Sequence, residues 1–558
     1  MKIFHWILAV LLFSHFTVRA GDQVYERVYV HTDKDCYVAG EDILLKFYVM
    51  DNNFQPSDLS KVGYVEINDT KRPQMQLKIA LEKGGGAGKI SIPQNISSGI
   101  YQLSGYTRYM RNEGENVFFQ KQIAVVNSAQ KNPDPERFEF VKKNELKYPE
   151  EKEPTGLLVR TSQKKYNNRQ KVYLSIDNIP ANTADLVISV SRNDSIAFVP
   201  EINKHEWLKQ VREISYFSQQ WLPEYGGHIV TGRFVPEPQE ELLASLAFVG
   251  NAIRYFTGQL NSSDGTVDFY TSGLFGKQQI VTSVVSPAYY DKVPYRLDPL
   301  SPFCASLPDN LPVLSVYFNE NQIFERYKGA QIQKETDYDL INNHARSFDY
   351  YNFQPNISYD LDEYIRFSTI SETILEFVNK VRVGKIRDKQ VISVFMDEKQ
   401  LYSSRTLVLL DGIPIYNHED ILNYNPMYIK RVNIYNESYV FGGVSFEGII
   451  SFITKEGNMP LFQLGSESQL HNYDFPQLPP SFDSPDYSNE QVRNSKRQDF
   501  RHTLYWNPFV EFTANRPANL SFYTSDLCGE FKVTVEAITT AGEIIQDLSF
   551  FQVIASSR

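Results

Sequence analysis

The sequence predicts a mainly β fold, with β-sandwiches in tandem and one small α+β unit. Three observations support this fold class. Aromatic residues make up 14% of the chain, with 35 Tyr and 37 Phe, and flat rings pack well on half-buried pleated surfaces. Apolar and polar residues alternate over most of the chain, with turn residues about every 8 to 12 positions, as in sandwiches. A helical period replaces this alternation only after Leu361.

The length of the chain predicts several domains. It has 558 residues, and single hydrophobic cores stop growing beyond about 250 residues. We therefore expect roughly three to five domains. The net charge of -11 is spread along the chain, whereas nucleic acids and anionic lipid surfaces attract clustered Lys and Arg. The composition predicts neither of these partners.

Residues 1–20 have the features of a signal peptide. Lys2 precedes an apolar run from Ile7 to Phe13, and small residues lead to Ala20, as at a cleavage site. A membrane anchor needs about 20 apolar residues, so this run is too short to be one. We expect an exported chain that begins near Gly21 and has no transmembrane segment after cleavage.

The cysteines predict no covalent framework. Cys36, Cys304 and Cys528 are the only cysteines of the chain. Three widely spaced thiols form neither a disulfide framework nor a zinc site. We therefore expect a protein that folds without disulfides.

The first third of the chain predicts two β units in series. Residues 21–127 alternate as short strands and form the first predicted sandwich, with Tyr37 among the residues that face its core and Gly40 at a turn with positive φ. Residues 128–155 are charged, contain Pro and are predicted to be a linker. Residues 156–200 repeat the opening pattern.

Sequence motifs in these two units carry a family resemblance. "VYVHTDKDCYVAGEDILLKFYV" (28–49) and "IPQNISSGIYQLSGYTRYMRN" (92–112) resemble the MG2 domain of the alpha-2-macroglobulin family. "SQKKYNNRQKVYLSI" (162–176) resembles the start of the next macroglobulin domain. The resemblance implies tandem macroglobulin-like or immunoglobulin-like sandwiches.

Residues 201–300 are predicted to be a third sandwich. The region around "NSSDGTVDFYTSGL" has a β pattern and is similar to the carboxypeptidase regulatory-like domain, although "PEPQEELLASLAFVGNAIRY" replaces the Gly-rich middle of that domain. Residues 301–360 are predicted to be a connector.

The α+β unit is predicted over residues 361–460. One helical face is spaced as Ile370, Ile374, Phe377 and Val378, as expected of an amphipathic helix. Thr369 and Glu372 fit a capping box at its start.

Four strands and a second helix follow in the same unit. We expect the strands at 391–396, 406–410, 430–435 and 448–454. Asp411-Gly412 is a hairpin signal, and Asn417 is placed to cap a short helix that begins with "HEDIL".

Three blocks of this unit resemble the plug domain of TonB-dependent outer-membrane receptors. They are "TLVLLDGIPIYN" (406–417), "ILNYNPMYIKRVNIYN" (421–436) and "YVFGGVSFEGIISFITKEG" (439–457). The resemblance implies a plug-like fold. A receptor of this family also needs a barrel of 22 strands, and each strand takes about 10 residues. Residues 461–558 are too few for it, so we expect a plug-like unit without a barrel.

The tail is divided into a Pro-rich linker over 461–500 and a C-terminal β unit over 501–558. The final unit alternates apolar and polar residues. Two interpretations stay open: a sandwich of its own, or strands that dock on an earlier unit.

No motif predicts an enzyme. "LCGEF" (527–531) has a Cys like that of a macroglobulin thioester, but Phe531 takes the place of the acyl-donating Gln, so we expect only a turn at Gly529. "GGGAGKIS" (84–91) lacks essential residues of a phosphate-binding loop and is predicted to be a hairpin. The His residues lack metal-ligand spacing. We predict no catalytic, cofactor or metal site.

The sequence therefore predicts a non-enzymatic protein that binds other proteins of a bacterial envelope, among them an outer-membrane β-barrel. The family resemblances imply the periplasm or the outer membrane as its location, and exposed strand edges are the expected means of contact. The predicted contact residues are Asp411, Gly412, Ile413, Pro414, Ile415, Tyr439, Phe441 and Phe446.

Two rival functions remain. One is TonB-linked nutrient uptake, with the plug-like unit supplied in trans to a separate barrel. It requires a TonB-binding segment near the mature N-terminus, where "GDQVYERVYV" instead predicts a strand. The other is an enzyme or a protease trap, which the motifs above do not support.

Overall fold

The structure is a computed structural model that describes most of the chain between Val24 and Ala555. The described residues are 24–130, 134–141, 156–193, 199, 217–235, 242–261, 265–286, 291–300, 303–317, 323, 325–330, 354–386, 388–441, 444–482 and 484–555. The predicted signal peptide lies outside them.

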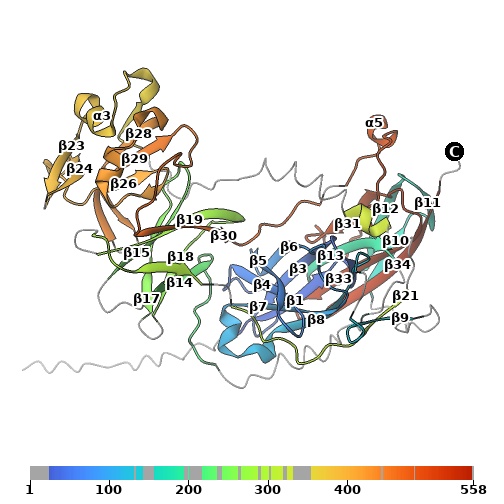
Figure 1. Cartoon of the computed structure of the whole chain (residues 1–558). Helices are drawn as coiled ribbons and strands as arrows, with labels where there is room; N and C mark the ends of the chain where they lie inside the picture. The colour runs from blue at the N-terminus through green and yellow to red at the C-terminus, as the bar shows by residue number, and fades with distance from the viewer. Residues whose placement is uncertain are drawn as a thin grey trace, which may run out of the picture.

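The described strands and helices form two groups (Figure 1). Two sandwiches packed against each other lie on the right of the view, and we call them the stacked pair. A third sandwich and an α+β unit lie on the left, and we call them the inserted pair. Strands dominate both groups. The mainly β fold class predicted from the sequence is confirmed.

The first sandwich consists of a three-stranded sheet, β1-β3-β6, and a five-stranded sheet, β2-β8-β7-β4-β5. Tyr37 is fully buried in the core between them, and Gly40 has a φ of 93°, both as predicted. The elements are β1 Arg27–Thr32, β2 Cys36–Val38, β3 Asp42–Met50, β4 Val62–Asn68, β5 Pro73–Ala80, β6 Gly85–Ser91, β7 Gly99–Thr107, η1 Tyr109–Asn112, η2 Glu115–Val117 and β8 Phe119–Val126.

The Gly-rich stretch 84–91 begins in a tight turn at Gly84, closed by backbone hydrogen bonds between Glu82 and Gly85, and continues as a strand from Gly85. As β6, it pairs with β3 along its whole length. A Cβ at Gly86 would lie 2.8 Å from Ile79, and one at Gly88 would lie 2.6 Å from Leu77. Glycine is therefore required here because the two sheets approach each other closely.

The second sandwich is assembled from two distant segments of the chain. Its sheets are β10-β12-β32 and β11-β34-β33-β13-β31, so the predicted units 156–200 and 501–558 are two parts of one sandwich. The strands are β10 Leu158–Thr161, β11 Lys165–Asn167, β12 Lys171–Asp177, β13 Thr183–Arg192, β31 Thr503–Asn507, β32 Ala518–Tyr523, β33 Gly529–Thr539 and β34 Ile544–Ile554.

Burial explains why the C-terminal strands dock on the earlier unit. β13 lies between β33 and β31, and its residues Leu186, Ile188 and Val190 are fully buried against C-terminal residues such as Phe531 and Val533. Without the C-terminal strands, β13 would expose both of its edges and this apolar face. The inserted pair therefore lies in the chain between two neighbouring strands of one sheet.

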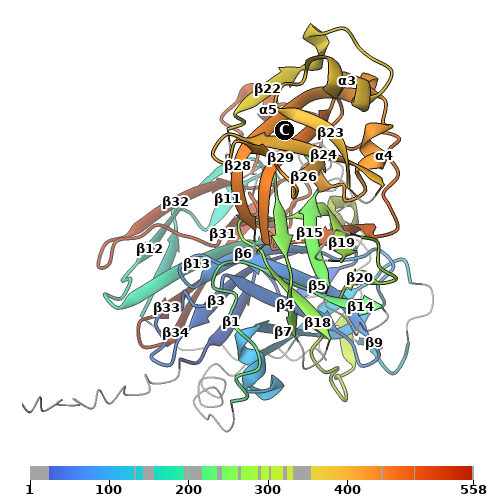
Figure 2. The same cartoon turned by 90° about the vertical axis from the view of Figure 1, so that its left-hand side faces the viewer.

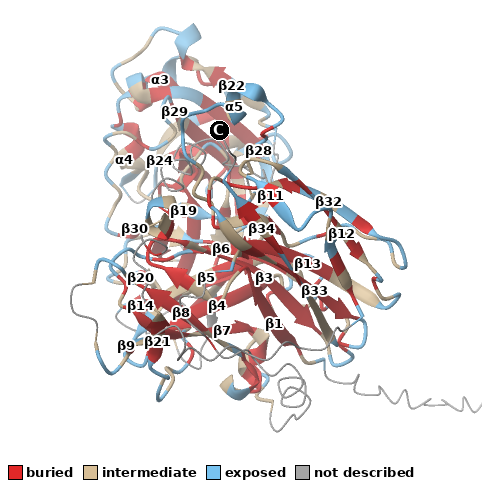
Figure 3. Ribbon diagram, turned by 90° about the vertical axis from the view of Figure 1, so that its right-hand side faces the viewer, coloured by how far each residue is buried: buried red, intermediate tan, exposed pale blue. Residues whose placement is uncertain are grey.

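The two sandwiches of the stacked pair bury a shared face. Every residue of β1 is buried, and Figure 3 shows β1, β3, β13 and β33 almost entirely in the colour of buried residues. The His31 ring stacks on Trp506 at 5.7 Å, and its Nδ1 lies 2.7 Å from Glu536 Oε2. Strands of different sandwiches thus pack through polar and aromatic side chains.

A small layer covers the outside of the first sandwich. It contains the parallel pair of β9 (Phe138–Val141) and β21 (Leu314–Tyr317) and the helical residues 325–330. Arg326 in this helix forms an ion pair with Glu41 at 2.7 Å. The predicted linker 128–155 and connector 301–360 therefore both contribute strands.

The third sandwich consists of the sheets β17-β18-β14-β20 and β16-β15-β19-β30. β30 comes from the predicted Pro-rich linker and is the edge strand of its sheet, where it pairs with β19 over seven residues. The strands are β14 Ile229–Val235, β15 Leu243–Phe248, β16 Tyr255–Thr257, β17 Gln259–Asn261, β18 Thr266–Tyr270, β19 Lys277–Val285, β20 Arg296–Pro299 and β30 Ser468–Asp474.

The α+β unit has a five-stranded sheet, β22-β28-β29-β26-β27, and a three-stranded sheet, β23-β24-β25. The four predicted strands lie in β24, β26, β28 and β29. The elements are β22 Ile357–Asp360, η4 Leu361–Glu363, α3 Ile370–Phe377, β23 Val381–Ile386, β24 Lys389–Met396, β25 Leu401–Tyr402, β26 Leu407–Leu410, β27 Ile413–Pro414, α4 His418–Leu422, η5 Pro426–Tyr428, β28 Ile429–Phe441 and β29 Val444–Thr454.

The predicted helix caps differ in outcome. Thr369 accepts a hydrogen bond from the Glu372 backbone N–H at 3.2 Å, and Ile370 and Ile374 are buried, as predicted for α3. Asn417 is the N-cap residue of α4 but makes no capping hydrogen bond, because its amide donates to the Asp420 carboxylate instead.

Candidate functional site

The predicted contact hairpin forms, and its turn has the expected geometry. Leu410 pairs with Ile413 across the turn, and the two turn residues, Asp411 and Gly412, have φ values of 44° and 80°. Positive φ at both positions is typical of a type I′ turn, for which Asp-Gly is a preferred sequence.

The Asp411 side chain fixes this turn to the end of β29. Its carboxylate accepts hydrogen bonds from the Thr454 N–H at 2.7 Å, the Thr454 hydroxyl at 2.5 Å and the Met459 N–H at 2.7 Å. The residue is fully buried. Three hydrogen bonds to a buried carboxylate compensate for its loss of water.

The turn also contacts the third sandwich. The Gly250 N–H donates to the Asp411 carbonyl at 2.9 Å. A Cβ at Gly412 would lie 2.6 Å from the Phe248 carbonyl oxygen. The hairpin therefore packs directly on the end of β15, and Figure 2 shows β26 next to β15.

Aromatic residues extend this contact. The Tyr416 hydroxyl lies 2.8 Å from the Ser245 hydroxyl and 3.0 Å from the Tyr255 hydroxyl. The Tyr255 ring in turn packs edge-on against Phe441 at 5.5 Å and Phe446 at 5.7 Å. One tyrosine of the third sandwich thus contacts both predicted parts of the contact region.

The predicted contact region is therefore internal. Tyr439 is half-buried, and the other seven predicted contact residues are buried: Asp411, Gly412, Ile413, Pro414, Ile415, Phe441 and Phe446. The prediction of an external contact at these residues is corrected here. The Asp411-Gly412 sequence predicts the turn. It does not predict that the end of β15 packs on this turn, because β15 lies far away in the sequence.

A second polar cluster, which the sequence analysis did not identify, joins the inserted pair to the first sandwich. His228 Nδ1 lies 2.8 Å from Glu224 Oε1, and His228 Nε2 lies 2.8 Å from the Tyr473 hydroxyl and 3.2 Å from Lys78 Nζ. The Tyr64 hydroxyl donates to Glu224 at 2.8 Å. We call these five residues the His228 cluster.

The partners of His228 require its neutral form. Nε2 faces the donors Lys78 and Tyr473, so it accepts, while Nδ1–H donates to Glu224. Burial lowers the pKa of His228 to about 4, and the charge of Lys78 lowers it as well, against the effect of Glu224. Burial also lowers the pKa of Lys78 to about 8. The cluster is a polar contact between the inserted pair and the first sandwich.

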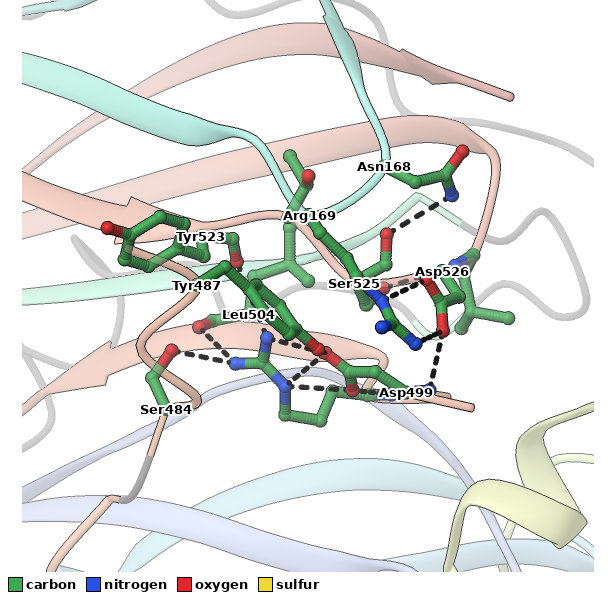
Figure 4. A network of polar contacts seen from close by, with 12 residues as sticks. Asn168, Arg169, Ser484, Tyr487, Asp499, Leu504, Tyr523, Ser525 and Asp526 are labelled. Carbon is green, nitrogen blue, oxygen red and sulfur yellow. Dashed lines mark hydrogen bonds and ion pairs between the residues drawn. The ribbon is translucent and has the colours of Figure 1, made fainter. Parts of the chain in front are cut away.

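A third network holds the segment that returns to the second sandwich (Figure 4). Arg169 forms an ion pair with Asp526 at 2.6 Å. Its guanidinium also donates to the carbonyls of Arg493, Ser495 and Arg497 at 2.7 to 2.8 Å. These carbonyls flank the end of α5 (Glu490–Arg493), so one side chain fixes an exposed loop.

Three exposed apolar side chains lie on neighbouring loops of the α+β unit. Ile365 is 82% exposed, Met427 is 51% exposed and Leu461 is 82% exposed. We call these three residues the tip patch. Their loops are neighbours, because Arg366 donates to the carbonyls of Pro426 and Ile429.

Leu461 belongs to the same patch. The Tyr424 hydroxyl donates to the Pro460 carbonyl at 2.6 Å, and the Tyr424 ring packs on Phe462 at 5.6 Å. The loop that holds Leu461 therefore lies against the loop that holds Met427.

The described residues contain no group of three or more His, Cys, Asp or Glu that is placed to hold a metal ion. All three cysteines are among them, and none forms a disulfide. Phe531 is fully buried in the core of the second sandwich. No described helix is long and apolar enough to span a membrane.

The chain was compared with protein families, curated proteins and solved structures, and only solved structures match. No family model and no curated protein matches the sequence. Matching solved structures include native Escherichia coli alpha-2-macroglobulin, which is 10% identical, with 95% of this chain and 40% of that chain covered and a TM-score of 0.24. The same protein activated by porcine elastase is 8% identical, with 95% of this chain and 44% of that chain covered and a TM-score of 0.24. Salmonella alpha-2-macroglobulin reacted with methylamine is 10% identical, with 95% of this chain and 39% of that chain covered and a TM-score of 0.24.

The chain spans less than half the length of these structures. They belong to the family that the first third of the sequence resembles, but TM-scores of 0.24 establish no shared function. The resemblance of residues 361–460 to a receptor plug stays a prediction.

Proposed function

We propose that this chain is a non-enzymatic, exported protein that binds other envelope proteins in the periplasm or at the outer membrane. The tip patch carries the proposal. Two of its three side chains are 82% exposed, and exposed apolar patches commonly mark protein contacts.

The construction of the tip supports a docking surface. Backbone carbonyls held by Arg366 and Tyr424 fix the three loops, so the apolar side chains are presented by an ordered frame. Pre-ordered loops lose little conformational entropy on binding. Apolar anchors on such a frame suit a partner with an apolar pocket.

An outer-membrane β-barrel remains the partner that we propose within this class. The contact is assigned to the tip patch, since the hairpin at Asp411 is covered by the third sandwich. Supplying the plug-like unit in trans to a barrel would require this cover to be removed, and no described contact favours that second function.

Affinity capture from intact envelopes tests the proposal. The tagged wild-type chain is compared with Ile365→Glu, Met427→Glu and Leu461→Glu, because each change places a charge in the tip patch. We expect each variant to recover at least tenfold less of a β-barrel or other envelope protein, which corresponds to about 1.4 kcal/mol.

The matched control is Leu548→Glu. Leu548 is 41% exposed on the second sandwich, so the same charge is added away from the tip. Equal recovery by all four variants and the wild type would refute the assignment to the tip patch. Retention of the chain in the cytoplasm would refute the export that the proposal includes.

A further inference from the structure

The contact between the two sandwiches of the stacked pair holds a buried lysine. Lys46 lies in the middle of β3, where it pairs with His31 on β1 and Ala87 on β6. Its side chain is 0% exposed. Neighbouring strands hold the backbone of Lys46 on both sides, so its side chain crosses to the second sandwich in a fixed direction.

The Lys46 amine meets one carboxylate and two rings there. Nζ lies 2.9 Å from Oδ2 of Asp185 on β13, 3.6 Å from the centre of the Phe509 ring and 5.0 Å from that of Tyr48. Among the described residues, Nζ makes no hydrogen bond with favourable angles. An ammonium has three N–H donors, so this charge is poorly compensated.

The other lysine–carboxylate pairs of the described residues differ from this one. The lysine of the next most buried pair, Lys34, is 11% exposed, and that of the Lys121–Asp35 pair is 17% exposed. The side chains of these two lysines are partly exposed to water. Burial lowers the pKa of Lys46, against the effect of Asp185, which increases the share of the neutral amine, the nucleophilic form.

We propose that Lys46 and Asp185 condense into an amide bond that joins the first and second sandwiches covalently. The chain itself supplies both reacting groups of this modification site.

The reaction needs no other reactant. A proton passes from Nζ to the Asp185 carboxylate, which leaves a neutral amine beside a neutral acid. The nitrogen lone pair attacks Cγ, one Cγ–O bond breaks, and that oxygen leaves with two hydrogens as water. One C–N bond replaces one C–O bond, with no change in oxidation state.

Geometry and solvation both favour the amide. Lys46 is paired with strands on both sides, Asp185 is paired with Ile538 on β33, and their side chains are in contact at 2.9 Å. Well-oriented groups react with effective molarities of roughly 10⁵ M or more. An ion pair that is removed from water is costly, whereas the amide is neutral. The Asp185 side chain is 29% exposed, which gives the released water a route to solvent.

Peptide mass spectrometry of the full-length, folded protein tests the proposal. The purified chain is denatured and digested with trypsin. We expect a branched peptide that joins the segments around Lys46 and Asp185, lighter than the sum of the two by one water, and no cleavage after Lys46. Lys46→Arg and Asp185→Ala remove the branched peptide.

Lys34→Arg is the matched control and keeps the branched peptide, because Lys34 belongs to another ion pair. The decisive measurement is made on the wild type, so it does not depend on how well any variant folds. A wild-type digest that contains only the two linear peptides, with cleavage after Lys46, overturns the proposal and leaves an ion pair.

Discussion

Two contacts within this molecule differ in kind. In the stacked pair, strands such as β1 and β3 are buried on both faces, and the second sandwich is closed by the last strands of the chain. The inserted pair meets the first sandwich through the His228 cluster and through backbone hydrogen bonds of Gln477 to Ala80 and Lys78. The first contact depends on burial of large faces, the second on a few polar groups.

The difference predicts how each part responds to change. Loss of buried apolar area in the stacked pair costs stability in proportion to that area. A small polar contact depends on the protonation of its members instead. We therefore expect the stacked pair to be sensitive to core mutations, and the orientation of the inserted pair to be sensitive to pH.

The largest effect is expected from Phe531→Ala. Phe531 is fully buried in the core of the second sandwich and stacks on Phe551 at 5.6 Å. Truncating a buried Phe costs about 3–5 kcal/mol. Calorimetry should show a lower melting temperature for the stacked pair and an unchanged transition for the inserted pair.

Phe550→Ala is the control for this comparison. Phe550 lies on the same β34 strand but is 37% exposed, so its truncation leaves a smaller cavity. If both variants melt like the wild type, the C-terminal strands do not complete the second sandwich.

Acidification is expected to have the next largest effect. The pKa of His228 is about 4 in the folded protein against an ordinary value of 6.5. As the pH falls, His228 therefore binds a proton more readily when the inserted pair is separated from the first sandwich than when the two are in contact. His228 therefore makes its full contribution to the contact above about pH 6.5, and roughly 3 kcal/mol of this contribution is lost by pH 4. The charged and titratable groups that face His228 are Glu224, Lys78, Arg108, Tyr64 and Tyr473.

Energy transfer between one dye on each pair measures this loosening. We expect the distance to increase between pH 6.5 and pH 4 in the wild type, and to be independent of pH in this range in His228→Gln. Because burial also lowers the pKa of His418 in the α+β unit to about 4, the His418→Gln variant serves as the control and should keep the wild-type response. A pH-independent distance in the wild type would contradict the prediction.

A third prediction concerns the contact within the inserted pair. Gly412→Ala places a Cβ 2.6 Å from the Phe248 carbonyl oxygen at a φ of 80°. Strain of this kind costs about 1–3 kcal/mol, and we expect protease cleavage between the α+β unit and the third sandwich to become faster. Gly384→Ala has no heavy atom within 4 Å and should be cleaved like the wild type.

Local patterns in the sequence account for the features that were predicted correctly. Alternation at period two identifies strands such as β12, and Asp411-Gly412 specifies a turn within four residues. The Thr369 cap is likewise a contact between residues three apart. Each of these features depends on backbone geometry that neighbouring residues determine.

Long-range pairing accounts for what the sequence did not reveal. β13 pairs with β33, and β19 pairs with β30, although the two strands of each pair lie far apart in the chain. Alternation shows that an edge needs a partner but not which strand supplies it. The His228 cluster draws residues from Tyr64 to Tyr473, so spacing in the sequence contains no signal for it.

The smallest effect is expected from Arg169→Gly. Arg169 has a φ of 55°, a conformation that glycine adopts without strain, so the backbone is retained while the guanidinium is lost. The carbonyls of Arg493, Ser495 and Arg497 then lose their donor. We expect a loss of about 1–2 kcal/mol, confined to this loop, and faster amide hydrogen exchange at residues 493–498. Arg160→Gly, at a residue whose side chain is 66% exposed, should leave that exchange unchanged. Equal exchange in the wild type and Arg169→Gly would mean that the short helix α5 holds the loop without the guanidinium.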